Sequence, residues 1–288
     1  MFYGGQSSEG VCMINKSVIL FYVLILSFVC NISFAQLSIS NDSSDCSCVS
    51  LWGIVGDDFK VSFNDGIKTF TSPFHYNTKD AIIAGAVLTT TALLFTVDNE
   101  TRTYFKKSNS SFNDGLKDVG NFYGNIYPTV IIGGGFYAYG LFGGNDNIRT
   151  TGRMVFESVA IAGLITTITK SVLGRHRPYT NDGSTKFEGP TIEDGYLSLP
   201  SGHATVAFAL STTLANRFHN TYISIGLYSL AGITALARIY DDKHWASDVF
   251  LGSAIGYFVG DFISGKKNKE TAYHIYPSLN GLKFVYNL

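Results

Sequence analysis

Six long apolar segments dominate this 288-residue chain and limit the folds that it can adopt. Each segment is long enough for a helix of four turns or more. Short polar connections separate most of them, so consecutive helices can pack up and down. The segments are Asp80–Val97, Tyr127–Phe142, Arg153–Leu173, Ser201–Phe218, Tyr222–Tyr240 and Ser247–Ser264. The sequence therefore predicts an all-α fold, a six-helix bundle over residues 80–265.

The remaining segments carry weaker patterns. Residues 101–125 are amphipathic, and their helical period predicts a buried face formed by Tyr104, Phe105, Leu116, Val119 and Phe122. Asp80 is placed to cap the first helix, and three glycines at 133–135 would let the second helix approach a neighbour closely. In the tail, residues 266–288, an Asn-Gly pair at 280–281 between alternating runs predicts a short hairpin.

The N-terminal part has the pattern of a secretory signal. A basic Lys16 precedes an apolar run over residues 17–30, and Ser33-Phe34-Ala35 forms a small-residue cleavage site. Residues 1–35 are therefore predicted to be a signal peptide, with Met13 as an alternative start. An uncleaved anchor helix is the competing interpretation, although the run is shorter than the ~20 residues of a span. Residues 36–79 are predicted to be an irregular lead-in with one short helix.

Charge and cysteine usage exclude some classes of protein. The chain has 21 basic and 22 acidic residues, so its formal net charge of −1 provides no attraction for nucleic acid. Cys46 and Cys48 remain after the predicted cleavage. They allow a strained bridge across one residue or a pair without a redox role. No other Cys or His lies near them in sequence, which argues against a metal site there.

Three short blocks of polar residues lie where apolar segments end or begin. Residues 170–178 follow the third segment, Pro200–His203 opens the fourth, and residues 238–248 join the fifth to the sixth. Together the blocks contain cations, two imidazoles, a carboxylate and the start of a helix. Cations and backbone N–H groups at a helix N-terminus bind phosphate, while one imidazole can attack and the other can carry a proton. The blocks therefore predict a site for a phosphate group.

These blocks resemble the three signature motifs of the type 2 phosphatidic acid phosphatase superfamily, which includes bacterial class A acid phosphatases and vanadium haloperoxidases. The family pattern is K-x6-R-P, P-S-G-H and S-R-x5-H-x3-D. The chain matches it at every position except one, where Ala237 replaces an accessory Ser. The resemblance covers about a quarter of the chain and implies a helical phosphatase domain over residues 80–265.

The resemblance also implies a role for each matched residue. Phosphate oxygens would be held by three cations, the Ser201 side chain and a backbone N–H of Gly202 or His203; the cations are Lys170, Arg177 and Arg238. His244 would be the nucleophile, with Asp248 orienting its other ring nitrogen, and His203 would be the general acid. The spacing agrees, because residues four apart in a helix share a face. A carboxylate on one ring nitrogen raises the basicity of the other.

Residues beside the motifs are expected to play smaller parts. Gly174 is predicted to end the third helix, so that Arg177 turns back over the site. Arg175 and His176 are interpreted as rim residues. The loop 179–199 is predicted to cover the site and to select the substrate. Residues 241–243 are expected to form a solvated loop, with Asp242 as a tuning residue.

The resulting hypothesis is a phosphatase that needs no metal or other cofactor, is inhibited by vanadate and acts through a phosphohistidine. The resemblance implies a phosphomonoester substrate, either a lipid phosphate or a small soluble ester. The alternatives are a vanadium-dependent haloperoxidase and a broad-specificity soluble acid phosphatase. The predicted signal indicates an exported protein in a Gram-negative bacterium, with a site facing the periplasm. The short, Thr-rich helices favour a soluble or membrane-associated bundle over a fully integral one.

Overall fold

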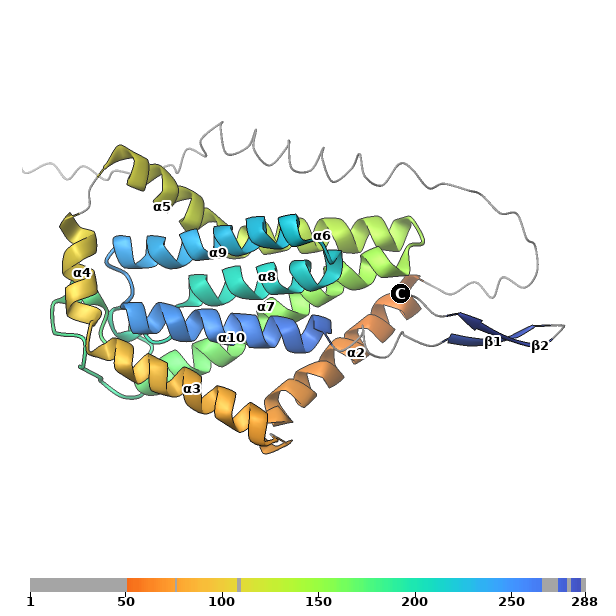
Figure 1. Cartoon of the computed structure of the whole chain (residues 1–288), viewed down its shortest axis with the longest axis horizontal. Coiled ribbons are helices and arrows are strands. Elements are labelled where there is room, and N and C mark those ends of the chain that lie inside the picture. Colours follow the sequence, from red (N-terminus) through yellow and green to blue (C-terminus); the bar gives the residue numbers. More distant parts are fainter. Residues whose placement is uncertain (1–50, 76, 108–109, 266–273, 279–280, 286–288) are drawn as a thin grey trace, which may run out of the picture. The chain divides into compact units, whose positions relative to one another are not determined.

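A computed structural model describes residues 51–75, 77–107, 110–265, 274–278 and 281–285. These residues form nine α-helices, which Figure 1 labels: α2 Leu51–Thr71, α3 Thr78–Phe95, α4 Asp98–Lys107, α5 Ser111–Tyr123, α6 Ile126–Phe142, α7 Asp146–Leu173, α8 Gly202–Phe218, α9 Thr221–Tyr240 and α10 Ala246–Gly265. Three 3-10 turns cover Ser72–His75, Pro178–Thr180 and Asp194–Tyr196. The signal, Cys46 and Cys48 lie outside the described residues.

The predicted all-α bundle and C-terminal hairpin are confirmed. Strands β1 His274–Ser278 and β2 Gly281–Val285 pair antiparallel, with Ser278 opposite Gly281. The number of helices differs from the prediction. Each of the six apolar segments is one helix, but the amphipathic stretch gives α4 and α5, and the supposedly irregular lead-in contains the 21-residue helix α2.

Two details of the helices differ from the sequence prediction. Asn77, not Asp80, is the N-cap of α3: its side chain accepts the N–H groups of Lys79 and Asp80, and Asp80 accepts the N–H of Asn77 in return. The predicted amphipathic face is also wrong in part, since Tyr104 is 68% and Val119 39% exposed. The face assumed one continuous helix, whereas α5 starts afresh from its own cap, Ser110, with a new phase.

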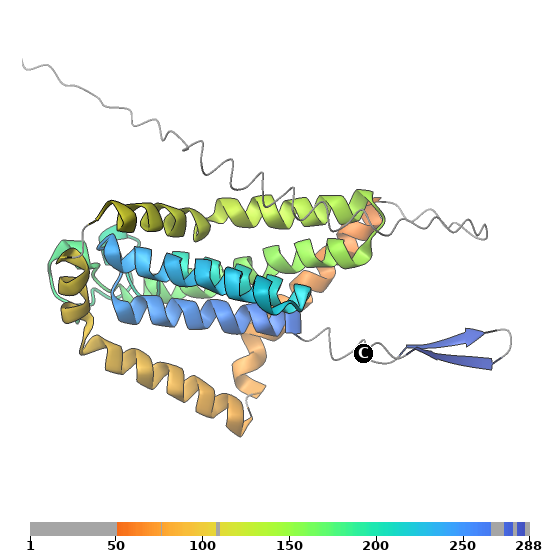
Figure 2. The same cartoon turned by 45° about the horizontal axis from the view of Figure 1, so that its top comes forward.

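Helix α8 lies at the centre of the bundle and contacts α7, α9 and α10. Figures 1 and 2 show it between α9 and α10. Gly252, Gly256 and Gly260 of α10 form a seam along it, where an added Cβ would lie 2.4, 2.3 and 3.0 Å from the carbonyl oxygens of Ser201, Thr205 and Ala209. Small residues at this spacing let two helices pack backbone to backbone. The seam fixes the start of α8 against the start of α10.

The bundle buries many hydroxyl groups beside an apolar core, and it exposes apolar side chains on its outside. Inside it, Thr213 donates to Ser158 at 2.8 Å, and the hydroxyls of Thr166 and Thr205 lie 3.0 Å apart. Four helices are long and apolar enough to cross a membrane, namely α3, α7, α9 and α10. Helix α3 shows the contrast best, because Ile82, Leu88 and Leu93 are all exposed. Hydroxyls between helices and apolar side chains outside are typical of helices that pack within a bilayer.

Candidate phosphate site

The three motif blocks meet at one end of the bundle, where α7 and α9 end and α8 and α10 begin (Figure 1). Gly174 ends α7 as predicted, in the left-handed conformation at φ 62°, and its N–H donates to the carbonyl of Lys170. The neighbouring backbone of Gly189 leaves no room for a Cβ there. The chain then turns back toward the site. Ser201 caps α8, and its backbone N–H donates to the carbonyl of Asp248 at 2.9 Å.

His244 is buried in the loop between α9 and α10, and one of its ring nitrogens is engaged. Nδ1 lies 2.8 Å from the carbonyl oxygen of Ser198. A carbonyl only accepts hydrogen bonds, so Nδ1 carries the proton and Nε2 keeps its lone pair. This tautomer is the one that a nucleophilic Nε2 requires.

Asp248 lies beside His244 but is not its hydrogen-bond partner, which differs from the predicted arrangement. Asp248 Oδ2 is 3.7 Å from His244 Nδ1. It instead accepts the Ser198 hydroxyl at 2.5 Å and the backbone N–H of Trp245 at 2.9 Å. The prediction assumed one helix through both residues, but α10 begins at Ala246, so His244 precedes it. Asp248 therefore positions Ser198, whose carbonyl binds the imidazole, and Trp245, the residue after His244.

The three predicted cations lie around this imidazole, and some of their N–H donors have no partner among the described residues. Lys170 donates to the carbonyl of Leu197 at 2.8 Å, Arg177 Nη2 to Asp194 at 2.8 Å, and Arg238 Nη1 to Asn121 at 2.6 Å. The Nε atoms of both arginines are buried and have no partner within the described residues. Buried donors of this kind normally have partners. The vacant hydrogen-bonding capacity marks where an anion can bind.

Ser201 and Gly202 complete the cradle at the start of α8. The Ser201 hydroxyl is buried, makes no capping bond and has no partner among the described residues. A Cβ on Gly202 would lie 4.0 Å from Cε of Lys170, so the backbone here lies directly beside the cation. The N-terminus of a helix also favours negative charge through its exposed N–H groups.

Burial and the neighbouring cations keep both imidazoles neutral. Burial, followed by the charges of Lys170, Arg177 and Arg238, lowers the pKa of His244 well below its ordinary value. Burial and the same cations lower the pKa of His203 to about 4. An anion bound beside the cations would offset their charge and raise the pKa of His203.

Arg175 and His176 are not rim residues, and this part of the prediction is wrong. Arg175 is 0% and His176 2% exposed. Arg175 donates to Asp248 Oδ1 at 2.5 Å and to Asp98 Oδ2 at 2.8 Å, and its guanidinium lies 3.9 Å from the centre of the Phe95 ring. Burial of a charge requires such partners. Arg175 is buried because it pairs with carboxylates that are distant in sequence, and no local pattern reveals such partners.

Asp98 and Asn121 are functional candidates that the sequence analysis missed. Asp98, at the start of α4, is buried and accepts the backbone N–H and the hydroxyl of Ser247 as well as Arg175. Asn121, on α5, accepts from Arg238 and donates to Asp241 at 2.6 Å. Asn121 therefore bridges Arg238 and Asp241, and the Asp241 carboxylate itself lies 3.6 Å from Nη1 of Arg238.

The loop 241–243 is not simply solvated. Arg102 of α4 grips Asp242 with two hydrogen bonds of 2.6 and 2.7 Å, and Lys106 adds a contact of 3.0 Å. Burial alone would raise the pKa of Asp242, but these cations outweigh it and hold the pKa below its ordinary value. Asp242 thus fastens α4 to the turn that carries His244.

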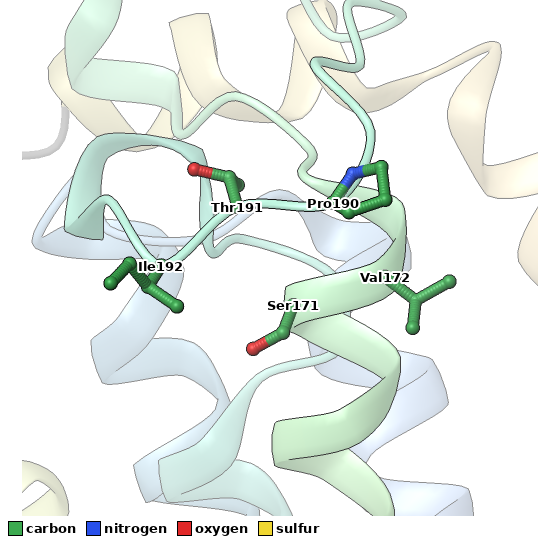
Figure 3. A pocket seen from close by; sticks show the side chains of 5 residues that line it. All are labelled: Ser171, Val172, Pro190, Thr191 and Ile192. Atoms are coloured by element: carbon green, nitrogen blue, oxygen red, sulfur yellow. The ribbon is translucent and has the colours of Figure 1, made fainter.

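The loop between α7 and α8 covers the site as predicted. Asp194 joins Arg177 to the Tyr179 hydroxyl, and His176 stacks on Tyr196 with ring centres 4.2 Å apart. On the outer side of α7, Figure 3 shows a shallow hollow lined by Ser171, Val172, Pro190, Thr191 and Ile192. None of the predicted site residues lines it, so this hollow is a surface feature distinct from the phosphate site.

The structure brings together all eight predicted site residues, namely Lys170, Arg177, Ser201, Gly202, His203, Arg238, His244 and Asp248. Among the residues it describes, no group of three His, Cys, Asp or Glu side chains is arranged to hold a metal ion. The described residues thus form a helical bundle with membrane-length apolar helices, a cationic, histidine-containing site at one end and a C-terminal hairpin. Residues 152–271 match the family described as the PAP2 superfamily.

The chain is also similar to curated proteins that are named as lipid phosphatases. A lipid A 1-phosphatase of Porphyromonas gingivalis is 26% identical over 247 residues, which cover 83% of this chain and 48% of the relative. A probable lipid phosphate phosphatase 4 of Arabidopsis thaliana is 32% identical over 138 residues, 36% of this chain and 44% of the relative. The chain spans about half the length of these curated relatives.

Among solved structures, a transmembrane PAP2-type phosphatidylglycerolphosphate phosphatase from Bacillus subtilis is similar. It aligns with a TM-score of 0.49 at 18% identity, and the alignment covers 64% of this chain and 95% of that chain.

Proposed function

We propose that this protein removes the phosphate group from lipid phosphomonoesters, with His244 as the nucleophile. The observation that supports it most is the set of buried, unpartnered donors around a neutral imidazole: Arg177 Nε, Arg238 Nε and the Ser201 hydroxyl. Such an arrangement provides hydrogen bonds for the equatorial oxygens of a transferring phosphoryl group without further rearrangement. The names of the curated relatives, which are lipid phosphatases, support a lipid phosphate as substrate.

In the first step, the Nε2 lone pair of His244 would attack phosphorus while the bond to the leaving oxygen breaks. His203 would give its proton to that oxygen, so the lipid leaves with a hydroxyl group in place of the phosphate. The imidazole ring becomes cationic as the N–P bond forms. The Ser198 carbonyl on Nδ1 and the Asp248 carboxylate 3.7 Å away would stabilise that charge.

In the second step, water would attack the phosphohistidine, and His203 would accept the water proton. The P–N bond breaks, inorganic phosphate leaves, and both imidazoles return to their starting states. Lys170, Arg177 and Arg238 would offset the phosphate charge throughout, a role that metal ions play in other phosphatases. No step of this scheme routes through a metal.

Phosphate release from detergent-solubilised protein tests the proposal. The wild type should hydrolyse phosphatidate and a lipid A-type 1-phosphate faster than a soluble aryl phosphate, and His244→Ala should lose all three activities. His219→Ala, at the opposite end of α8, is the matched control and should remain active. A folded His244→Ala protein with wild-type turnover would remove His244 from the chemistry. Equal rates on soluble and lipid esters would instead indicate a broad-specificity phosphatase.

We also propose that the site faces the periplasm from a bundle that crosses the membrane. This proposal replaces the soluble or surface-held bundle that the sequence favoured, because four helices are long and apolar enough to span. It also takes the apolar run over residues 17–30 as uncleaved, the competing interpretation of the N-terminal part. Helix α10 runs from the site to the opposite end of the bundle, so a spanning bundle places residues 199 and 265 on opposite sides. Topology reporters inserted in the loop 179–199 should then read as periplasmic, and reporters after Gly265 as cytoplasmic. Periplasmic readings at both positions would favour a bundle held at the membrane surface, and a cytoplasmic loop would refute the orientation.

A further inference from the structure

Helix α2 presents a narrow aromatic stripe that the protein itself does not cover. Its members are Trp52, Phe59, Phe63 and Phe70, with 84%, 71%, 60% and 41% of their surface exposed. At about 100° per residue, the four side chains fall within roughly 40° of one another on the helix. The stripe extends over 19 residues, from Trp52 to Phe70, and forms one continuous face of α2.

The face of α2 that packs on the bundle is polar, which is the reverse of a water-soluble helix. Asp58 accepts the Tyr137 hydroxyl at 3.0 Å and pairs with Arg149 at 3.1 Å. Ser62 donates to Glu157 at 3.1 Å and accepts from Arg153 at 3.2 Å. These contacts fix the rotation of α2, so the aromatic stripe is held away from α6 and α7.

A third face of α2, beside the stripe, carries exposed charges. Lys60 pairs with Asp57 at 3.1 Å, and both side chains are exposed. Lys68 pairs with Asp65 at 3.4 Å. An aromatic face bordered by a charged face is typical of helices that lie in the plane of a membrane surface, with the rings in the boundary between headgroups and acyl chains.

The place of α2 in the fold fits that orientation. Figures 1 and 2 show α2 running obliquely to α7 and α10, two of the helices that are long enough to cross a membrane. The chain continues through the exposed Phe74 into α3, whose apolar side chains are exposed along its length. The contacts on α7 at residues 149–157 lie about 20 to 32 Å along the helix from Lys170. The stripe is therefore at the end of the bundle remote from the phosphate site.

We propose that the aromatic stripe of α2 inserts into the headgroup–acyl boundary of the leaflet at the end of the bundle opposite the active site. The inference goes beyond the proposed hydrolysis and rests only on the bundle residing in a membrane. A second copy of the chain fits the stripe less well. The four rings offer about 500 Å² of exposed surface, whereas a standard protein interface takes roughly 800 Å² from each partner.

Tryptophan fluorescence tests this placement directly, because Trp52 and Trp245 are the two tryptophans of the chain. Trp245 is buried and donates to the carbonyl of His176 at 2.9 Å, so it serves as an internal reference. The full chain would be reconstituted in phosphatidylcholine–phosphatidylglycerol vesicles that contain phospholipids brominated either near the glycerol or near the acyl terminus. Subtracting the Trp52→Phe signal from the wild type isolates Trp52 without altering the site.

Bromines near the glycerol should quench Trp52 at least twofold more than bromines near the acyl terminus, and aqueous iodide should quench it weakly. Phe59→Ser should increase iodide quenching, whereas the control Lys60→Ser on the charged face should not. Strong iodide quenching of the wild type would place the stripe in water and overturn the proposal. Quenching by neither probe would indicate a covering protein, and strongest quenching by terminal bromines would indicate a helix that crosses the bilayer; both would also overturn it.

Discussion

Replacing Asp98 by Asn should damage catalysis at a distance, because Asp98 is one of two carboxylates that hold the buried Arg175. Asn keeps the shape of the side chain and can still accept the backbone N–H of Ser247, but it removes one negative charge. Arg175 would then rely on Asp248 alone among its carboxylate partners. Asp248 should shift toward Arg175 and away from Ser198 and Trp245, which position His244.

The magnitude of this effect follows from the buried contacts. Removing one partner of a buried ion pair costs about 3–5 kcal/mol, and the hydrogen bonds that Asn retains favour the lower end. A loss of about 3 kcal/mol corresponds to a fall of roughly 6–12 °C in the unfolding midpoint for a domain of this size. Misplacing His244 by the loss of one charged hydrogen bond, about 1.5–3 kcal/mol, should lower kcat about 10- to 150-fold.

Thermal unfolding in detergent and steady-state phosphate release would measure both effects. The KM and the inhibition constant for vanadate should change little, because Lys170, Arg177 and Arg238 do not contact Asp98. The control Asp57→Asn removes an exposed pair with Lys60 and should leave stability and kcat unchanged. A folded Asp98→Asn protein with wild-type kcat would refute the positioning role, and an equal loss in kcat and vanadate affinity would indicate general damage to the site.

Three further predictions concern the phosphate site itself. Arg177→Lys and Arg238→Lys should each reduce kcat/KM by about 10- to 100-fold although they conserve charge. Lysine lacks the Nε donor, which in each arginine has no partner among the described residues. Unchanged kinetics in both variants would show that these residues do not bind the phosphate. Vanadate should inhibit hydrolysis and EDTA should not, whereas activity lost to EDTA and restored by a divalent ion would show that the metal-free scheme is wrong. Burial and the neighbouring cations lower the pKa of His203 to about 4. Bound phosphate should raise this pKa, so the loss of activity at alkaline pH should occur at higher pH for kcat than for kcat/KM. Coincident alkaline limbs, or a limb that persists in His203→Ala, would exclude His203 as the acid.

Much of the site was predictable because its functional residues lie in three short stretches of sequence. The motif spacing identified residues from four helix ends, and Gly174 was recognisable as a helix stop because Gly-Arg-His-Arg-Pro cannot continue a helix easily. The six apolar segments predicted six of the nine described helices. The buried seam of Gly252, Gly256 and Gly260, spaced four apart, was also visible in the sequence but carried no weight until its partner, α8, was known.

The rest depended on contacts between distant residues. Arg175 looks like an exposed cation in a run of charged residues, and only Asp98 and Asp248, 77 and 73 positions away, explain its burial. Asn121 lies 117 positions from Arg238 and belongs to no motif. Helix α2 was predicted only as one short helix in an irregular segment, because Ser, Asn and Asp clusters suggested loops, although its aromatic residues recur at helical spacing.

A trapped phosphoenzyme would test the central claim most directly. Protein mixed with a lipid substrate labelled in its phosphate and quenched in alkali within the first turnovers should carry label on histidine, because phosphohistidine survives alkali and is lost in acid. We predict labelled His244 in the wild type and no label in His244→Ala. Label should accumulate in His203→Ala if loss of the base slows hydrolysis of the phosphohistidine more than it slows formation of the phosphohistidine. Substrate turnover by the wild type with no label at any quench time, or equal label in His244→Ala, would contradict a phosphohistidine at His244.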